Sequence, residues 1–345
     1  MIELRTLTDG GQPAEETARA LASFLAAARR TLEIAIYDLH LPPPLDEIVR
    51  GALADAAARG AAVRLAYNVD HERTPGVSPP PRTDPALVEA LPFPTAAIPG
   101  VPDLMHHKYV VRDGASVWTG STNWTADSWT REENVIAIVD SPELAARYRD
   151  DFEQLWSTRD VSRSGRVDTA PLLVGETRVR PWFCPGHGDK LAHRIAKAIG
   201  SAKRRVRIAS PVISSGPILG TLAQVVSDGR VDLAGVVDAT QVDEVLRQWH
   251  ENGNVEWKEP LLRRALTHAP FSGKRSTPYA PGSVHDYMHA KVTVADDVAF
   301  VGSYNLSHSG ELNAENVLEI ASPELADRLA AFVDEVRGRY PTLEL

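Results

Sequence analysis

Two stretches of this 345-residue chain repeat one pattern. Residues 105–148 read MHHKYVVRDGASVWTGSTNWTADSWTREENVIAIVDSPELAARY, and residues 288–329 read MHAKVTVADDVAFVGSYNLSHSGELNAENVLEIASPELADRL. The two His-x-Lys units begin at His106 and His289, 183 residues apart. That separation is the length of a domain and far exceeds the period of a solenoid repeat. The sequence therefore predicts two copies of one domain.

Each copy carries the same polar residues at nearly the same spacing. Alternation along a strand places His106 and Lys108 on one face, as two groups that bind one phosphate require. A glycine that lets the backbone turn tightly or approach closely follows, and then Ser and Asn supply neutral donors. The second copy has one residue fewer between its Asp and its Gly. The matching sets are His106, Lys108, Asp113, Gly120, Ser121 and Asn123, and His289, Lys291, Asp296, Gly302, Ser303 and Asn305.

The segments before each motif alternate between apolar runs and amphipathic stretches. This alternation predicts α/β units with largely buried strands. The Ser-Pro-Glu that follows each motif predicts a helix with Ser as its N-cap and Pro at its first position. The expected strands are 33–38, 61–70, 206–214 and 231–238, and the expected helices are 45–60, 191–205 and 218–229.

The predicted boundaries are a first lobe at 1–160, a polar linker at 161–175 and a second lobe at 176–345. Two further stretches lack periodicity and are expected to be long loops that lead into the histidines. One is 71–104, which contains nine prolines, and the other is 257–287, which is rich in basic residues.

Composition limits the class of protein. Hydrophobic residues make up 43% of the chain and charged residues 24%, a soluble globular balance. The chain has no apolar run long enough for a membrane span, and its start lacks the pattern of a secretion signal. The single Cys184 cannot form an internal disulfide. We expect a cytoplasmic protein without stable membrane insertion. A monomer is expected because one chain holds both motifs.

The paired motifs resemble those of the phospholipase D superfamily, whose members carry HxKxxxxD followed by GSxxN. The resemblance covers nearly the whole chain. It implies two similar α/β/α lobes with mixed sheets, related by a pseudo-twofold axis, with one site between them. It also implies a metal-independent phosphodiesterase that needs no cofactor and acts through a phosphohistidine.

The resemblance implies a role for each motif residue. His106 is the expected nucleophile and His289 the expected general acid and base. Lys108, Lys291, Asn123 and Asn305 would cradle the phosphoryl oxygens, with Ser121 and Ser303 as further substrate-binding donors. An acidic residue is expected to orient each histidine, and the candidates are Glu133 and Glu315. Asp113 and Asp296 are expected to hold the motif loops and complete the candidate catalytic set.

Other residues near the motifs invite weaker interpretations. Cys184 and His187 lack further ligands at a fitting spacing, so we predict no metal site. Asp38 and His40 follow a predicted strand and would line the pocket or form a solvated turn. The remaining candidates are three histidines expected at a polar rim, His107, His285 and His308, and three tryptophans expected in the core, Trp118, Trp124 and Trp129. The alternative for Trp124 is stacking on a substrate.

The substrate is the open question. A nucleic-acid phosphodiester is the leading hypothesis, because GSTNWT and REENVIAIVDSP resemble the nuclease branch and residues 257–275 are basic. A net charge of −9 argues mildly against it. The alternative is a phospholipid hydrolase or phosphatidyl transferase, which the two-lobed single chain favours. A catalytically idle binding module is the third hypothesis, and two intact motifs count against it.

Overall fold

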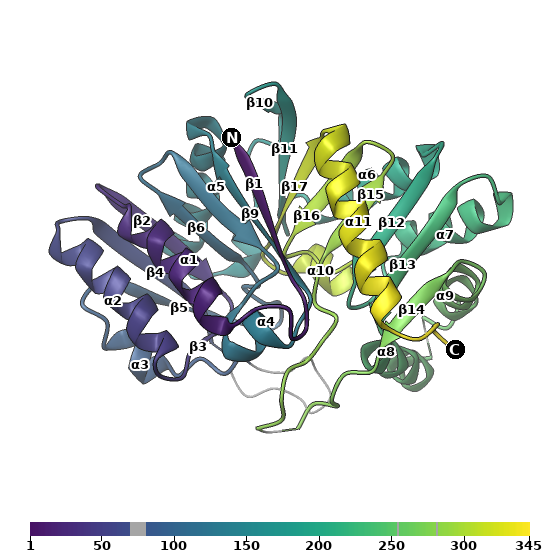
Figure 1. The fold of residues 1–345 in the computed structure, drawn as a ribbon, viewed down its shortest axis with the longest axis horizontal. Coiled ribbons are helices and arrows are strands. Elements are labelled where there is room, and N and C mark those ends of the chain that lie inside the picture. Colours follow the sequence, from purple (N-terminus) through teal and green to yellow (C-terminus); the bar gives the residue numbers. More distant parts are fainter. Residues whose placement is uncertain (70–80, 254, 281) are drawn as a thin grey trace.

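The computed structural model describes residues 1–69, 81–253, 255–280 and 282–345, which form two lobes side by side (Figure 1). The first lobe contains a seven-stranded mixed sheet in the order β1-β9-β7-β6-β2-β4-β5. Neighbours β2, β4 and β5 are parallel, whereas the other pairs are antiparallel. The strands are β1 (Ile2–Leu7), β2 (Thr31–Ile36), β4 (Ala62–Val69), β5 (Thr95–Pro99), β6 (Lys108–Arg112), β7 (Ser116–Gly120) and β9 (Asn134–Asp140).

The second lobe repeats this sheet. Its order is β10-β11-β17-β16-β15-β12-β13-β14, which matches the first sheet strand for strand from β11 onward. The predicted duplication and the mixed α/β fold are therefore confirmed. The strands are β10 (Leu172–Val174), β11 (Thr177–Cys184), β12 (Arg205–Ser210), β13 (Asp232–Asp238), β14 (Phe271–Lys274), β15 (Val292–Ala295), β16 (Val298–Gly302) and β17 (Glu315–Ala321).

Helices cover both faces of each sheet. Four outer helices pack on the faces away from the core that both lobes share: α1 (Ala14–Ala26) and α2 (Leu45–Ala58) in the first lobe, and α6 (Gly188–Ser201) and α7 (Gly216–Asp228) in the second. The opposite faces carry α5 (Pro142–Thr158) in the first lobe and α11 (Pro323–Arg339) in the second, which pack on the shared core. In Figure 1, α1, α2 and α11 lie in front of the sheets. The predicted caps of these two helices are confirmed, because Ser141 Oγ accepts from Leu144 N and Ser322 Oγ from Leu325 N.

Buried apolar side chains form three clusters. One lies under α1 and α2, and another lies under α6 and α7. The third is shared by both lobes, since it joins Tyr148 and Phe152 of α5 to Phe332 and Val333 of α11. Apolar residues on alternating strand positions face either the outer helices or this shared core. The lobes are therefore joined by a core, which fixes their relative position.

Both predicted long loops contain regular structure. The described part of 71–104 includes α3 (Pro85–Glu89) and edge strand β5, and residues 70–80 lie outside the described residues. The stretch 257–287 includes α9 (Lys258–Thr267) and edge strand β14. The end of the predicted linker forms edge strand β10. Edge strands are short and pair on one side only, so their sequence pattern is weak.

The remaining elements are short or peripheral. They are β3 (Leu39–His40), which pairs with β8 (Trp124–Thr125), and α4 (Ala126–Thr130), α8 (Ala239–Asn252) and α10 (His308–Leu312), with a 3₁₀ turn at Val161–Arg163. None of the helices in the described ranges is both long enough and apolar enough to cross a membrane.

Candidate active site

The two motif histidines lie where the lobes pair with each other. Met105, next to His106, forms a parallel bridge with Ala314 of the second lobe, and Met288, next to His289, forms one with Glu133 of the first. His106 N donates to Ala314 O at 2.9 Å. Each histidine is therefore held against the opposite lobe, at the predicted interface.

The residue before each histidine is anchored by its own lobe as well. Met105 N donates to Asn68 Oδ1 at 3.0 Å, and Met288 N donates to Asp238 Oδ2 at 3.0 Å. Asn68 and Asp238 lie near the carboxyl ends of the matching strands β4 and β13, where sites of α/β sheets commonly open. Sequence reasoning did not single out this pair, although the two residues lie at equivalent places near the ends of equivalent apolar strands.

His106 is oriented by a carboxylate from the second lobe. Its Nδ1 lies 2.8 Å from Glu315 Oε1, and Ser303 Oγ donates to Glu315 Oε2 at 2.5 Å. The Glu315 carboxylate is fully buried. An imidazole with Nδ1 committed to a carboxylate presents Nε2 to a substrate. Glu315, which was counted from His289 in the sequence, thus contacts the motif histidine of the other half. Ser303, which was expected to bind substrate, donates to this carboxylate.

His289 is oriented by a different pair. Its Nδ1 lies 3.1 Å from Asn134 Oδ1 and 3.3 Å from Glu132 Oε2. Asn134 Nδ2 donates to Glu132 Oε2 at 3.1 Å, and Ser121 Oγ donates to Asn134 Oδ1 at 2.6 Å. Asn134 therefore occupies the place that Glu315 holds in the other half, and Glu132 supplies the carboxylate.

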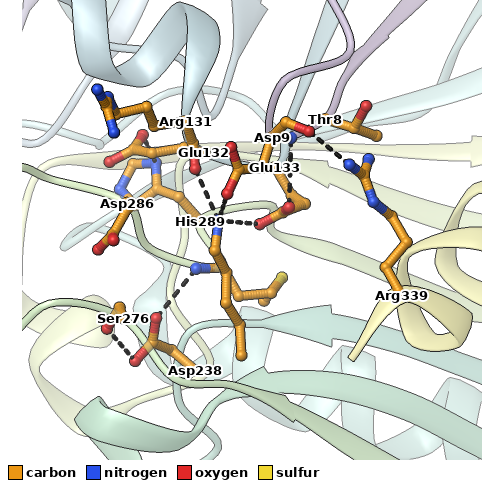
Figure 2. A network of polar contacts seen from close by, with 12 residues as sticks. Thr8, Asp9, Arg131, Glu132, Glu133, Asp238, Ser276, Asp286, His289 and Arg339 are labelled. Atoms are coloured by element: carbon orange, nitrogen blue, oxygen red, sulfur yellow. Dashed lines mark hydrogen bonds and ion pairs between the residues drawn. The ribbon is translucent and has the colours of Figure 1, made fainter. Parts of the chain in front are cut away.

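The predicted contact between Glu133 and a motif histidine is wrong. The Glu133 carboxylate instead accepts from Lys274 Nζ at 3.1 Å and from Tyr340 Oη. Figure 2 shows Glu133 on the side of Asp9, whereas Glu132 lies on the side of His289. Neighbouring residues of an extended segment point to opposite sides, so Glu132 and Glu133 meet different partners.

A one-residue difference between the two halves explains this error. Gly120 pairs with Ile136, 16 residues later, whereas Gly302 pairs with Val317, 15 residues later. The Glu-Asn dipeptides at 133–134 and 315–316 match in sequence, yet they are offset by one position in the sheets. A Cβ on Gly120 would meet Val135 O at 2.1 Å, and one on Gly302 would meet Asn316 O at 2.0 Å. The glycines therefore permit close strand approach.

The two lysines adopt the same geometry in both halves. Lys108 Nζ donates to His106 O at 2.6 Å, and Lys291 Nζ donates to His289 O at 2.5 Å. Both side chains are almost completely buried, at 2% and 4% exposure. Lys108 Nζ also lies 5.0 Å from the centre of the Tyr37 ring. Two buried ammonium groups thus flank the two imidazoles.

Burial and mutual repulsion shape the ionisation of these groups. Burial, reinforced by Lys108 and Lys291, lowers the pKa of His106 well below its usual range. Burial, reinforced by both lysines and His106, does the same to the pKa of His289. Burial lowers the pKa of Lys108 to about 7 and lowers the pKa of Lys291 well below its usual range. The arrangement therefore favours an anion that would offset the crowding of cationic groups.

Two buried carboxyl groups share the site. Burial raises the pKa of Glu315 to about 7, although Lys108 and Ser303 oppose the shift. Burial also raises the pKa of Glu132 to about 7, against hydrogen bonds from Ser128 and Asn134. Groups that titrate near neutral pH and lie beside paired imidazoles are typical of acid–base sites.

The motif asparagines each present one buried oxygen. Asn123 Oδ1 and Asn305 Oδ1 find no hydrogen-bond partner among the residues that the structure describes. Buried polar atoms in folded proteins are nearly always paired. The equivalent asparagines of the two halves thus share a feature that fits a ligand-facing position.

Asp113 and Asp296 lie at the far ends of the motif strands and have structural roles. Asp113 accepts from the backbone N–H groups of residues 29–31, and Asp296 accepts from those of residues 203–205. Both adopt a left-handed backbone conformation, with φ of 56° and 51°. They hold the loops as expected, and β6 separates Asp113 from His106. We therefore remove both from the candidate catalytic set.

His107 is not at a rim. It is fully buried, because alternation points it away from His106 and Lys108 into the shared core. His285 is half-buried beside Asp127, whose carboxylate accepts from its backbone N–H, and His308 is exposed on α10.

The other residues with weaker interpretations from the sequence are in part buried and in part exposed. Asp38 is buried and accepts from Arg82 N at 2.9 Å, whereas His40 is exposed. Cys184 is buried, and His187 Nε2 bonds to Val167 O. The tryptophans at 118, 124 and 129 pack in the outer core of the first lobe, as predicted.

Glu132 and Asn134 are the site residues that sequence reasoning missed. A signal was present in the interval from the Glu-Asn pair to the Ser-Pro-Glu cap, because Ser141 lies eight residues after Glu133 whereas Ser322 lies seven residues after Glu315. An extra residue in an extended segment reverses which side chains face the site. Sequence spacing alone did not show where along the first half the extra residue lies, and so did not show that Asn134 takes the place of Glu315.

Comparisons with known proteins agree with this geometry. A family model described as "Cardiolipin synthase, PLD-like domain" matches residues 21–156 and 195–337. A mitochondrial cardiolipin hydrolase of Xenopus laevis is 29% identical over 140 residues, which cover 39% of this chain and 59% of that protein. A phospholipase D of Rickettsia bellii is 29% identical over 136 residues, covering 39% and 62%.

A solved structure matches over nearly the full length. The phosphatidylserine synthase of Haemophilus influenzae Rd KW20 superposes with a TM-score of 0.70 at 15% identity, covering 99% of this chain and 87% of that one. The chain spans less than two thirds of the length of the first curated relatives. With two matched domains, one fold and two complete motif sets, the chain belongs to the phospholipase D superfamily of phosphodiesterases.

Proposed function

We propose that this protein is a phosphodiesterase that cleaves a phospholipid headgroup bond, by hydrolysis or by transfer to an alcohol. One observation carries the proposal: two buried His–Lys units meet between the lobes, and each imidazole is held through Nδ1. Paired imidazoles beside two ammonium groups meet the needs of phosphoryl transfer, namely a nucleophile, a proton donor and charge neutralisation.

The proposed reaction has two balanced steps. Nε2 of one histidine attacks phosphorus, the bond to the leaving alcohol breaks, and the other histidine gives its proton to the leaving oxygen. Water or an alcohol then attacks phosphorus while the second histidine takes its proton, the phosphorus–nitrogen bond breaks, and the first histidine is released unmodified. Lys108 and Lys291 neutralise the phosphoryl oxygens, and acid–base help contributes about 10²–10⁴-fold.

We propose His106 as the nucleophile and His289 as the acid and base. A phosphohistidine carries positive charge on the attacking ring, and the nearest carboxylate stabilises that charge best. Glu315 lies 2.8 Å from His106, whereas the carboxylate nearest His289, that of Glu132, lies 3.3 Å away. A looser carboxylate contact also lets His289 release its proton more readily.

The names of the matched relatives and the contacts of the basic residues in 257–275 support a lipid substrate over a nucleic acid. The family description and the matched relatives refer to cardiolipin or phospholipids. Four basic residues of 257–275, the stretch that favoured nucleic acid in the sequence, have partners within the protein. Lys258 donates to Ser214 O, and the ion pairs are Arg263–Glu259, Arg275–Asp243 and Lys274–Glu133. These carboxylates offset part of the positive charge that a phosphate backbone would meet there.

A substrate panel tests the proposal. The full chain is incubated with EDTA and with vesicles of phosphatidylglycerol, cardiolipin or phosphatidylcholine, an aryl phosphodiester, single-stranded DNA and RNA. We expect release of a lipid headgroup and no cleavage of nucleic acid. Cleavage of DNA or RNA alone would reverse the substrate assignment. Turnover of no substrate would contradict the proposed activity, and loss of turnover in EDTA would contradict the metal-independent route.

Trapping distinguishes the histidines. In a His289→Asn variant, phosphate label from the substrate should accumulate on the protein, and His106→Asn should remove it. Label retained by His106→Asn would move the nucleophile to His289.

A further inference from the structure

His107 stands between the two motif residues of the first half, and its side chain is completely buried. Its ring packs against Tyr109, with centroids 4.9 Å apart, and lies 6.5 Å from the ring of Phe183 in the second lobe. Burying an imidazole among aromatic rings is costly unless its nitrogens are engaged.

Both ring nitrogens meet buried polar partners. Nε2 lies 3.0 Å from Asp151 Oδ2 of α5, off the direction of a good hydrogen bond, so the contact is an ion pair when His107 is protonated. The same carboxylate accepts from Tyr109 Oη at 2.9 Å and from Gly165 N at 3.0 Å. Nδ1 lies 3.2 Å from Asn316 Oδ1 of the second lobe.

This last contact runs beside the contact that orients His106. His106 and His107 are consecutive in the first lobe, and they pair with Glu315 and Asn316, which are consecutive in the second. Asn316 is held further by bonds from its Nδ2 to Thr119 Oγ1 at 2.7 Å and to the Tyr148 hydroxyl at 3.0 Å. Two adjacent cross-lobe contacts therefore set the position of Glu315 relative to His106.

The second half lacks this arrangement. In the aligned motifs, Ala290 stands where the first half has His107, and Val292 stands where it has Tyr109. Counted from the serine caps of α5 and α11, Phe332 stands in the place of Asp151. All three are buried apolar residues. Apolar side chains thus fill the equivalent space in the second half of the same fold. Packing alone therefore does not require the polar residues His107 and Asp151.

We propose that His107 and Asp151 are a buried positioning pair that holds Asn316 and Glu315 in place and thereby orients the His106 imidazole. The inference rests on the proposed function, because it assigns a role within that site. In this proposal Asp151 fixes the His107 ring, and His107 fixes Asn316 of the second lobe. Because Glu315 is the residue next to Asn316, its carboxylate is held beside His106. The His106 imidazole is thereby held more rigidly than the His289 imidazole.

The test compares three variants with a matched control. His107→Ala copies the residue of the second half, His107→Gln keeps a side-chain amide donor for Asn316, and Asp151→Asn removes the anchoring charge. Ile199→Ala, in the separate apolar cluster under α6 and α7, serves as the control for lost stability. Each is assayed for Tm, for kcat and KM on bis(4-nitrophenyl) phosphate, and for the ¹⁵N resonances of the His106 ring.

For His107→Ala we expect kcat to fall at least tenfold, KM to stay within about twofold, and the Nδ1 resonance of His106 to shift. His107→Gln should recover most of kcat, and Ile199→Ala should lose Tm without these changes. An unchanged kcat and ring spectrum in His107→Ala would overturn the proposal. So would a fall in kcat that merely follows Tm, as in the control.

The ring spectrum separates this inference from the proposed function. If the wild-type protein turns over no phosphodiester, the function fails, and the His106 resonance still reports whether His107 positions it. If His107→Ala does not fold, kcat and the His106 ring spectrum of Asp151→Asn and His107→Gln test the positioning role instead. Wild-type kcat and spectra in Asp151→Asn would refute the pair.

Discussion

Glu315 in the second lobe reaches across the interface and lies 2.8 Å from Nδ1 of His106 in the first. The contact exists only when the lobes are docked, and the shared apolar core holds them so. An imidazole whose Nδ1 faces a carboxylate is locked in one tautomer and can support positive charge. The two halves therefore complete each other's chemistry.

The first prediction concerns this contact. Glu315→Gln should lower kcat by about 10²–10⁴-fold, because the amide can present the wrong hydrogen-bonding group to Nδ1 and cannot stabilise an imidazolium. KM should change little, since Glu315 acts through His106. Steady-state kinetics on an aryl phosphodiester measure both constants. Glu335→Gln, on an exposed position of α11, is the control. A kcat close to wild type in Glu315→Gln would refute the role.

The second prediction separates two neighbouring carboxylates. Glu132→Gln should lower kcat markedly, because Glu132 lies beside His289. Glu133→Gln should mainly reduce stability, because it weakens a buried ion pair with Lys274, whose side chain is 5% exposed. Kinetics and thermal unfolding of both variants distinguish them. The opposite pattern would restore the assignment made from sequence spacing.

The third prediction is a pH dependence of anion binding. Lys108, with a pKa of about 7, is charged below pH 7 and neutral above it, whereas Glu132 and Glu315 gain negative charge through the same range. Both changes disfavour an anion as pH rises. Affinity for sulfate, whose charge is constant here, should fall about tenfold per pH unit above 7.

Calorimetric titration of sulfate between pH 5.5 and 8.5 measures this dependence. Lys108→Met should bind weakly and with a shallower slope. Affinity that rises with pH in the wild-type protein would show that the site does not carry the proposed charges.

The fourth prediction concerns the far ends of the motif strands. Asp113→Asn keeps a residue that tolerates the left-handed conformation but weakens acceptance from three backbone N–H groups. Its free energy of unfolding should fall by about 1–2 kcal/mol, with kcat of the folded protein nearly unchanged. Urea unfolding and kinetics test both parts, and Asp296→Asn is the matched variant of the second half. A large loss of kcat without loss of stability would return Asp113 to the catalytic set.

Much of this architecture followed from the sequence by itself. The duplication, the alternation of strands and helices, and the caps at Ser141 and Ser322 are local patterns, and local patterns reflect propensity and burial directly. The same holds for the motif residues, because strand alternation alone places His106 and Lys108 on one face.

The tertiary structure decided which carboxylate meets which histidine. Glu315 pairs with the histidine of the opposite lobe, and Glu132 replaces Glu133 beside His289, because one extra residue shifts the register of the first half. The burial of His107 in the shared core likewise depends on how the lobes dock. Such contacts join residues distant in the chain, and their partners are set by sheet register and domain packing, which no local pattern records.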